Sequence, residues 1–266
     1  MNETSPYIHR HIADSITEAA RYFSVITLTG PRQSGKSTLF RHLYPNVPYI
    51  NLETPDTRLI AKRDPKSLLN EYADGLIIDE VQHIPELLSY IQTIVDDEPN
   101  RRYYLTGSSQ FSLLKTVNQS LAGRSAVFEL MPLSLSEISD LRADKSIDDI
   151  LYSGFYPAIW SGKNTPSLFY PSYNKTYIER DVRTILEVKH LDAFQRFVRL
   201  CAARIGSIFN ASELSNEIGV SVNTILAWLS VLQASYLIYL LPPFHTNTRK
   251  RLTKSPKIYF TDCGPV

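Results

Sequence analysis

Eight residues near the start of the chain, GPRQSGKS at positions 30–37, match the pattern G-x-x-x-x-G-K-[ST] at every fixed position. The two glycines let the backbone turn tightly and come close to a phosphate without a Cβ in the way. The amides of such a loop surround an anion, and the helix that follows adds its positive N-terminal end. The pattern therefore predicts a phosphate-binding loop with these nucleotide contacts: Gly30, Pro31, Arg32, Gln33, Ser34, Gly35, Lys36, Ser37 and Thr38.

Two residues of this loop suit a nucleoside triphosphate and its metal ion. Lys36 is placed to reach the β and γ phosphates, and the hydroxyl of Ser37 is placed to ligate Mg²⁺. The apolar run VITL precedes the loop and a helical pattern follows it. This context favours a nucleotide site over a chance match, because the motif needs a strand before it and a helix behind it.

Two carboxylates, Asp79 and Glu80, end the apolar segment LIIDE at residues 76–80. Asp79 fits the carboxylate that orients Mg²⁺ in a P-loop NTPase. Glu80 is one residue further along and is expected to point elsewhere, where it can act as general base for the attacking water. The alternative is an exposed acidic strand end that serves only solubility.

The spacing between the loop and these carboxylates indicates the subclass. Lys36 and Asp79 lie 43 residues apart, which leaves room for a helix, the strand VPYINLE and another helix. The acidic strand is therefore not the next strand in sequence. This arrangement, with its Asp-Glu pair, is similar to the NTPase division that inserts a strand between the two Walker strands and carries its own glutamate.

Small hydroxyl residues follow another apolar run, in YYLTGSS at 103–109. Ligands of open parallel sheets bind beyond the carboxyl ends of the strands. Thr106, Ser108 or Ser109 is therefore a candidate to contact the attacking water or the γ-phosphate, and we take Ser108 to represent them. The alternative is a polar turn between a strand and a helix, since Ser and Gly are common in turns.

Arg124 stands in LAGRSAVFEL, between a predicted helix and the last predicted strand of the first part. An arginine there can cap helix carbonyls and complement the helix dipole. It can also act as an arginine finger that completes the nucleotide site of a neighbouring chain. The sequence leaves both interpretations open.

The elements around these residues alternate between strand and helix. Strands are predicted at 25–30, 47–53, 75–81, 101–108 and 126–134, with helices at 36–43, 56–73, 85–96 and 110–122. Strands separated by helices argue for a mostly parallel sheet. The predicted fold class is α/β, a P-loop NTPase core with a five-stranded parallel sheet over residues 1–140. Helices at 146–160 and 172–204 then predict a helical lid over residues 141–205.

The last part, residues 206–266, resembles a winged-helix region. We expect Ser212 to cap its first helix, Gly219 to form the turn and Ser221 to cap its second helix. The second helix, VNTILAWLSVLQ, has no Lys or Arg, which speaks against strong base readout.

The segment 245–259 of this region carries five cations and no acid: Arg249, Lys250, Arg251, Lys254 and Lys257. It suits either a DNA backbone, with an affinity that falls as salt rises, or an acidic protein surface. We weigh a protein surface above DNA.

Composition fits a globular protein of one or two domains, with 266 residues and a net charge of +1. Residues 1–140 hold 13 Lys and Arg against 17 Asp and Glu, and residues 141–266 hold 15 against 10. This asymmetry suggests an acidic and a basic module, although ordinary scatter of surface charge explains it as well. The two distant cysteines and an N-terminus without an apolar signal region predict a cytoplasmic protein. The apolar segment 225–241 is expected to be core rather than a membrane span.

Together these segments resemble the prokaryotic AAA-type ATPases, of the AAA+ superfamily, that carry a C-terminal domain of unknown function. The segments that carry the resemblance lie between about residue 8 and residue 264: ITLTGPRQSGKSTL, YINLETPDTRLIAKRDP, LIIDEVQHIPELL, YYLTGSSQFSLL, SLAGR, MPLSLSEI, GFYP, YIERDV and SPKIYFTDCG. Such relatives continue well beyond FTDCGPV, so we expect this chain to be shortened at its C-terminus relative to them.

The resemblance implies ATP as the nucleotide, Mg²⁺ as the metal and assembly into a homo-oligomer. No guanine-reading N-K-x-D motif is present in the sequence. In YIERDVRTI, residues 177–185, Arg180 or Arg183 either reaches the nucleotide from the lid or forms a salt-bridged helix surface.

The sequence thus predicts an Mg²⁺-dependent ATPase that couples its nucleotide state to a protein or DNA partner. The first alternative is a non-catalytic switch that binds ATP and thereby gates binding to DNA or protein. The second is an interaction module whose nucleotide site stays empty.

Overall fold

The computed structural model describes residues 7–108, 117, 120–178, 191–244 and 254–265. The chain divides into two compact units, one from Pro6 to Ser139 and the other from Asp140 to Val266. Each unit is described by itself below.

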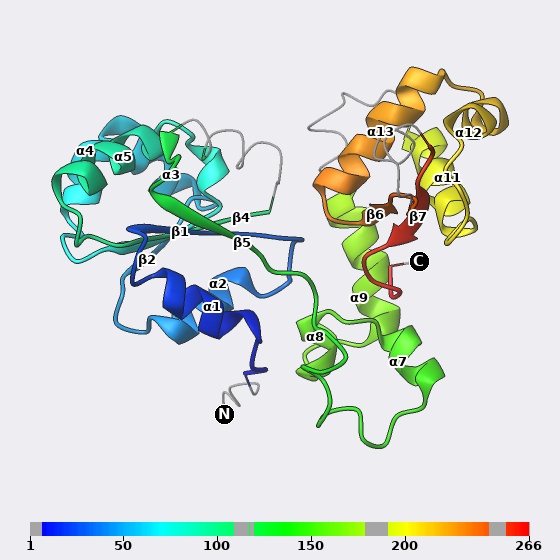
Figure 1. Cartoon of the computed structure of the whole chain (residues 1–266), viewed down its shortest axis with the longest axis horizontal. Coiled ribbons are helices and arrows are strands. Elements are labelled where there is room, and N and C mark those ends of the chain that lie inside the picture. Colours follow the sequence, from blue (N-terminus) through cyan, green and yellow to red (C-terminus); the bar gives the residue numbers. More distant parts are fainter. Residues whose placement is uncertain (1–6, 109–116, 118–119, 179–190, 245–253, 266) are drawn as a thin grey trace. The chain divides into compact units, whose positions relative to one another are not determined.

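The first unit is built on a parallel sheet of five strands (Figure 1). The strands are β1 (Val25–Thr29), β2 (Tyr49–Asn51), β3 (Leu76–Asp79), β4 (Tyr103–Gly107) and β5 (Ser125–Glu129). Their order across the sheet is β2-β3-β4-β1-β5, and every pairing is parallel. The predicted AAA-like sheet is confirmed, including the strand β2 that lies in sequence between the phosphate loop and the acidic strand.

Helices cover both faces of this sheet (Figure 1). They are α1 (Ile12–Ala19), α2 (Lys36–Leu43), α3 (Pro55–Arg63), α4 (Pro65–Asn70) and α5 (Leu87–Asp97), with a short 3-10 turn η1 at Val81–His83. Side chains of a strand alternate between the faces, so Leu76 and Ile78 pack in the cluster with α3, α4 and α5 while Ile77 packs with α1 and α2. Burial on both faces explains why β3 is a continuous apolar run.

The predicted helix over 56–73 is wrong in one respect, because it consists of two helices. The break falls at Asp64 and Pro65. The side chain of Asp64 accepts a hydrogen bond from the amide of Ser67 at 2.9 Å, and Pro65 takes the first position of α4, where its missing N–H costs nothing. The helix predicted at 110–122 lies mostly outside the described residues.

The second unit consists of helices followed by a small antiparallel hairpin. Its elements are α7 (Ile147–Ser153), α8 (Pro157–Trp160), α9 (Pro166–Tyr173), the π-helical turn η2 (Asn174–Ile178), α11 (Leu191–Ala202), α12 (Ala211–Ile218), α13 (Val222–Ala234), β6 (Ile238–Leu241) and β7 (Lys257–Phe260). The predicted single helix at 146–160 ends at Ser153. Gly154 interrupts it with a φ of 60°, in a position where a Cβ would lie 2.0 Å from the hydroxyl of Tyr170.

One hydrophobic core joins the segments that the sequence suggested as a lid and as a winged-helix region. Phe169 and Tyr173 come from the first segment, and Trp228, Leu232 and Ile258 come from the second. The aromatic rings of Phe194 and Trp228 meet edge to face with their centroids 5.5 Å apart. The two segments are therefore parts of one folded unit.

The turn between α12 and α13 has the expected chemistry, with one correction. Gly219 ends α12 with a φ of 82°, and the side chain of Ser221 accepts a hydrogen bond from the amide of Thr224 at the start of α13. Ser212 does not cap α12. Asn210 does, because α12 begins at Ala211 and the Asn210 side chain accepts from the amide of Glu213 at 3.2 Å.

None of the helices in the described part of the chain could cross a membrane alone by length and composition. Helices α12 and α13 together pass that test, but they meet at a bend of 109°. Six residues of α13 are buried in the core of the second unit, in agreement with the expectation for segment 225–241: Ile225, Trp228, Leu229, Val231, Leu232 and Ala234.

Candidate nucleotide-binding site

The phosphate loop connects β1 to α2, as its sequence predicts. Gly30 has a φ of 143°, and a Cβ on it would lie 2.2 Å from the carbonyl oxygen of Leu130. Only glycine fits there. Gly35 precedes α2 in the left-handed conformation, with a φ of 96°, and so turns the chain into the helix.

Lys36 is buried within the loop. Its ammonium group donates to the carbonyl oxygens of Gly30 and Pro31, at 3.0 and 2.8 Å. Burial lowers the pKa of Lys36 to about 8, although the nearby carboxylates of Glu80 and Asp79 act in the opposite direction. Neutral carbonyls are weak partners for a buried cation, so phosphate oxygens in the loop would be stronger ones.

The remaining predicted loop contacts surround this lysine. Ser34 is fully buried, Arg32 is half-buried, and Gln33 and Thr38 are exposed. Gln33 has a φ of 61°, an uncommon conformation for a residue with a side chain. Loops that bind anions use such left-handed residues to turn successive amides inward.

The carboxylate of Asp79 accepts hydrogen bonds from the hydroxyl groups of three neighbouring elements. Its Oδ2 accepts from the hydroxyl of Ser37 at 2.6 Å and from the phenol of Tyr49 at 2.7 Å. Its Oδ1 accepts from the hydroxyl of Thr106. These side chains meet because β2 and β4 flank β3 in the sheet and the loop follows β1 at the same edge.

The pair formed by Ser37 and Asp79 fits a magnesium site. Mg²⁺ in nucleotide sites takes one or two carboxylates, water and the phosphates of the substrate. Here one buried carboxylate and one hydroxyl are in direct contact at the mouth of the phosphate loop. The donor set suits the predicted metal.

Glu80 follows β3 in a left-handed conformation, with a φ of 55°. This conformation is unfavourable for a residue with a Cβ, and such strain occurs often at functional sites. The Glu80 carboxylate accepts from the hydroxyl of Ser108 at 3.0 Å and from the side-chain amide of Gln82. Both of these bonds are made to Oε2 of Glu80.

The structure separates the roles of the three candidate hydroxyls after β4. Thr106 contacts Asp79, Ser108 contacts Glu80, and Ser109 lies outside the described residues. Ser108 is the one that touches the candidate general base. The two arginines that were candidates for the lid, Arg180 and Arg183, also lie outside the described residues.

Arg124 lies at the other end of the sheet. It directly precedes β5, whose first residue pairs with Val25 at the start of β1, whereas the phosphate loop follows the end of β1. Five strand residues at about 3.3 Å each separate these two edges. Arg124 therefore cannot reach the phosphate loop of its own chain.

The guanidinium of Arg124 forms a two-point ion pair with Asp96 at the end of α5. The distances are 2.5 Å from Nε to Oδ1 and 2.7 Å from the terminal nitrogen to Oδ2. The hydrogen bonds from Arg124 hold the pKa of the Asp96 carboxyl below its usual value. Arg124 also donates to the carbonyl of Ala122, as an arginine that caps a helix end would.

One arginine of the site escaped the sequence analysis. Arg10 is only 5% exposed and donates to the carbonyl of Ser34 in the phosphate loop at 2.8 Å. It also donates to the carbonyl of Met131 at 2.6 Å and to the carboxylate of Glu137 at 3.0 Å. Arg10 thus connects the phosphate loop to the segment after β5 through hydrogen bonds.

The carboxylate of Glu137, the partner of Arg10, accepts several hydrogen bonds. Burial alone would raise the pKa of Glu137, but the amides of Ser134 and His11 and the Arg10 guanidinium together lower it. The segment MPLSLSEI supplies Met131 and Glu137 and was part of the family resemblance. No spacing in the sequence connects that segment with position 10.

A parallel sheet in the order β2-β3-β4-β1-β5, with a phosphate loop after β1 and an acidic pair after β3, defines the P-loop proteins of AAA type. Residues 22–139 match the family model described as an AAA domain. Residues 144–266 match the model of a domain of unknown function, DUF8612. The chain therefore combines an AAA domain with this second domain.

Three curated proteins that are similar to this chain are described as uncharacterized. Proteins of Mycobacterium tuberculosis and Mycobacterium bovis are each 30% identical to this chain over 261 residues, a match that covers 96% of the chain and 58% of the relative. A protein of Methanocaldococcus jannaschii is 24% identical over 265 residues, covering 88% of the chain and 59% of the relative. The chain thus spans less than two thirds of the length of these relatives.

Among solved structures, the chain is similar to the Walker-type ATPase paby2304 of Pyrococcus abyssi. The TM-score is 0.63 at 14% sequence identity, and the match covers 97% of this chain and 95% of the other. At this identity the likeness supports the fold alone.

Proposed function

We propose that the protein binds Mg-ATP and hydrolyses it. The observation that carries this proposal is the meeting of the phosphate loop, Asp79, Glu80 and Ser108 at one edge of the sheet. An acidic strand end that served only solubility would not bury Asp79 or hold both carboxylates with hydroxyl groups from other elements.

Each residue has a role that its contacts support. The loop amides and Lys36 bind the phosphates, and Ser37 and Asp79 hold Mg²⁺, which shields the charge of the phosphates when it is bound. Glu80 takes a proton from the attacking water as general base. Ser108 holds Glu80 in place and is a positioning residue. ATP is favoured over GTP by the resemblance to AAA proteins.

We propose further that Arg124 acts on the site of a neighbouring copy. The position of Arg124, at the opposite end of the sheet from the phosphate loop of its own chain, supports this proposal. An arginine finger supplied in trans raises the rate by about 10³–10⁵-fold in other P-loop NTPases. Such a finger requires a homo-oligomer. In it, Arg124 leaves Asp96 and contacts the γ-phosphate that is bound by the neighbouring copy.

The ion pair between Arg124 and Asp96 also favours a second candidate function. If that pair is permanent, Arg124 only fixes the end of α5 to the start of β5. The chain would then bind ATP with negligible turnover and act as a nucleotide-gated switch for a protein or DNA partner.

A comparison of binding with turnover tests the proposal. Mg-ATP at about 100 times its Kd should stabilise the protein by about 2.7 kcal/mol, and Glu80→Gln should keep that stabilisation while it loses hydrolysis. Glu86→Gln is a matched control, because Glu86 is an exposed glutamate six residues further along. Binding without hydrolysis in the unaltered protein would favour the switch, and no stabilisation by Mg-ATP would contradict both functions.

We also propose that this reaction takes place in the cytoplasm. Both cysteines, Cys201 and Cys263, are free thiols, which a reducing compartment favours.

A further inference from the structure

The hairpin of the second unit has one buried face and one uncovered face. In its register Tyr239 stands opposite Tyr259, and Leu241 stands opposite Lys257. These four side chains alternate with core residues such as Ile258, so they share the face that points away from the core. Tyr239 is 52% exposed.

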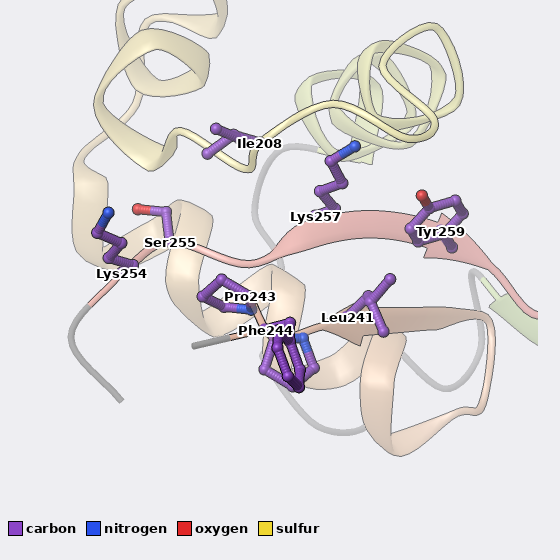
Figure 2. A pocket seen from close by; sticks show the side chains of 9 residues that line it. Ile208, Leu241, Pro243, Phe244, Lys254, Ser255, Lys257 and Tyr259 are labelled. Atoms are coloured by element: carbon purple, nitrogen blue, oxygen red, sulfur yellow. The ribbon is translucent and has the colours of Figure 1, made fainter. Parts of the chain in front are cut away.

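A cavity of about 620 Å³ opens beside this face (Figure 2). Leu241, Pro243 and Phe244 line it from the end of β6, and Lys254, Lys257 and Tyr259 line it from the chain that enters and forms β7. Figure 2 shows the two lysines along the β7 side of the hollow, with Phe244 and Leu241 on the β6 side.

The composition of this surface is unusual for a solvated face. The Phe244 ring is 93% exposed, and the described lining carries two lysines without any acidic residue. Arg249, Lys250 and Arg251 of the predicted basic segment lie outside the described residues. A ligand that offers flat apolar groups together with negative charge would match this surface.

Single-stranded nucleic acid has that chemistry. Each base has a face that stacks on an aromatic ring, and each phosphate pairs with a lysine. An acidic protein surface would also satisfy the lysines, but a single strand of nucleic acid places a stacking face beside every negative charge, as the rings of Phe244 and Tyr239 require. The charge pattern alone favoured a protein surface over DNA, and the exposed rings reverse that preference.

A duplex fits this surface less well than a single strand. The faces of paired bases are already covered by their neighbours in the stack, so an exposed ring has nothing to stack on. The helix that would enter a major groove, α13, has no Lys or Arg, and its exposed residues include Val222 and Leu226.

We infer that the uncovered hairpin face, formed by Tyr239, Leu241, Phe244, Lys254, Lys257 and Tyr259, binds single-stranded DNA. Bases stack on the rings and the backbone runs past the two lysines. The inference names the partner that the proposed function leaves open, and it depends on that function only for the coupling of DNA binding to ATP.

Fluorescence anisotropy with a labelled oligothymidylate of about 20 nucleotides tests the inference on the full chain without nucleotide. The unaltered protein should bind, and its affinity should fall steeply as the salt concentration rises. Lys254→Glu with Lys257→Glu should abolish most of the binding and reduce the salt slope by about 1 for each lysine. Phe244→Ala should weaken binding about tenfold through lost stacking.

Two matched controls come from exposed positions elsewhere in the same unit. Lys163→Glu reverses the charge of an exposed lysine, and Tyr152→Ala removes a ring that is 64% exposed on α7. Both should bind the oligonucleotide as the unaltered protein does. Circular dichroism confirms that every variant is folded.

Four results would overturn the inference: no binding, unchanged binding by the lysine and Phe244 variants, tighter binding of a duplex or of an RNA of the same length, or displacement of the DNA by polyglutamate at equal charge concentration. Because no ATP is present, these results are independent of hydrolysis. Conversely, the lysine variants should keep the ATPase rate, so failure of the proposed function would appear only in the ATPase measurement.

Discussion

The phenol of Tyr49 donates a hydrogen bond to Oδ2 of Asp79, 2.7 Å away, and shares that oxygen with the hydroxyl of Ser37. Burial and the bond to Asp79 raise the pKa of the Tyr49 phenol, so it stays a donor. Tyr49 is thus a second hydrogen-bond partner that fixes the orientation of the candidate magnesium ligand.

Loss of the Tyr49 hydroxyl should therefore weaken magnesium binding. In Tyr49→Phe, Asp79 keeps its other two hydroxyl partners but rotates more freely. Outer partners of metal ligands commonly contribute about 10–100-fold in metal affinity. We expect the Mg²⁺ concentration for half-maximal hydrolysis to rise at least tenfold, with little change in the rate at saturating Mg²⁺.

Tyr103→Phe is the matched control for this variant. Tyr103 is a buried tyrosine of strand β4 in the same sheet, and its hydroxyl has no hydrogen-bond partner among the described residues. Its removal should leave the Mg²⁺ dependence unchanged. Equal Mg²⁺ curves for Tyr49→Phe and the unaltered protein would show that Tyr49 does not position Asp79.

Ser108 should affect turnover rather than binding. Its hydroxyl donates to the Glu80 carboxylate at 3.0 Å, so Ser108→Ala leaves the candidate base held by Gln82 alone. We expect kcat to fall about tenfold, which corresponds to about 1.4 kcal/mol in the barrier, and KM for ATP to stay nearly constant. Ser89→Ala, at an exposed position of α5, should change neither constant. A rise in KM without a change in kcat would place Ser108 on the nucleotide instead.

The pair of Arg10 and Glu137 should contribute to stability in a pH-dependent way. Glu137→Gln weakens hydrogen bonds to a charged group that is mostly buried, which costs about 2 kcal/mol of unfolding free energy at pH 7. The pKa of Glu137 is lowered in the folded protein from its ordinary value of 4.5. Its contribution is therefore fully present above pH 4.5 and is lost as the pH falls through the folded pKa.

Chemical unfolding can separate the stability of the AAA unit, which contains Glu137, from the stability of the second unit. Both tryptophans, Trp160 and Trp228, belong to the second unit, so a transition seen by circular dichroism but not by tryptophan fluorescence reports the AAA unit. The stability difference between the unaltered protein and Glu137→Gln should be constant from pH 7 to pH 5 and should shrink below pH 4.5. Glu71→Gln, at an exposed position, should show no such difference. A difference that persisted unchanged in acid would contradict a role for the ionised carboxylate.

Arg124 offers a test that uses two inactive variants. Arg124→Ala keeps an intact Glu80, and Glu80→Gln keeps an intact Arg124. If the arginine acts on a neighbour, hydrolysis should be at least 10³-fold slower in Arg124→Ala and at least 100-fold slower in Glu80→Gln. A mixture of the two variants should regain activity. Asp96→Ala alone should stay active, because it removes only the resting partner of the arginine. Failure of the mixture, with Asp96→Ala as impaired as Arg124→Ala, would mean that Arg124 acts only within its own chain as a structural ion pair.

Much of the AAA unit could be predicted from sequence because its signals are local. The phosphate loop occupies fixed positions around Lys36, and the strand that ends at Asp79 is apolar since both its faces are covered. The break between α3 and α4 also has a local signal, a capping aspartate, Asp64, followed by a proline. It was not predicted because the segments on both sides of Asp64 have a helical pattern.

The contacts that escaped prediction depend on the sheet order or join distant parts of the chain. Tyr49 reaches Asp79 only because β2 pairs with β3 in one register, and Arg10 meets Glu137 across a separation of 127 residues. The distance between Arg124 and the phosphate loop likewise became clear only from the pairing of β5 with β1. Residue types alone carry none of this information.

The most direct test of the central claim is the rate of Mg-ATP hydrolysis per chain as the protein concentration is raised, with Glu80→Gln measured beside it. We expect the rate to climb with concentration, as Arg124 of one copy reaches the site of another, and to fall at least 100-fold in the variant. A rate that is independent of concentration and equal in the variant would contradict hydrolysis at this site, because neither Glu80 nor an Arg124 from a neighbouring copy would then contribute to the rate.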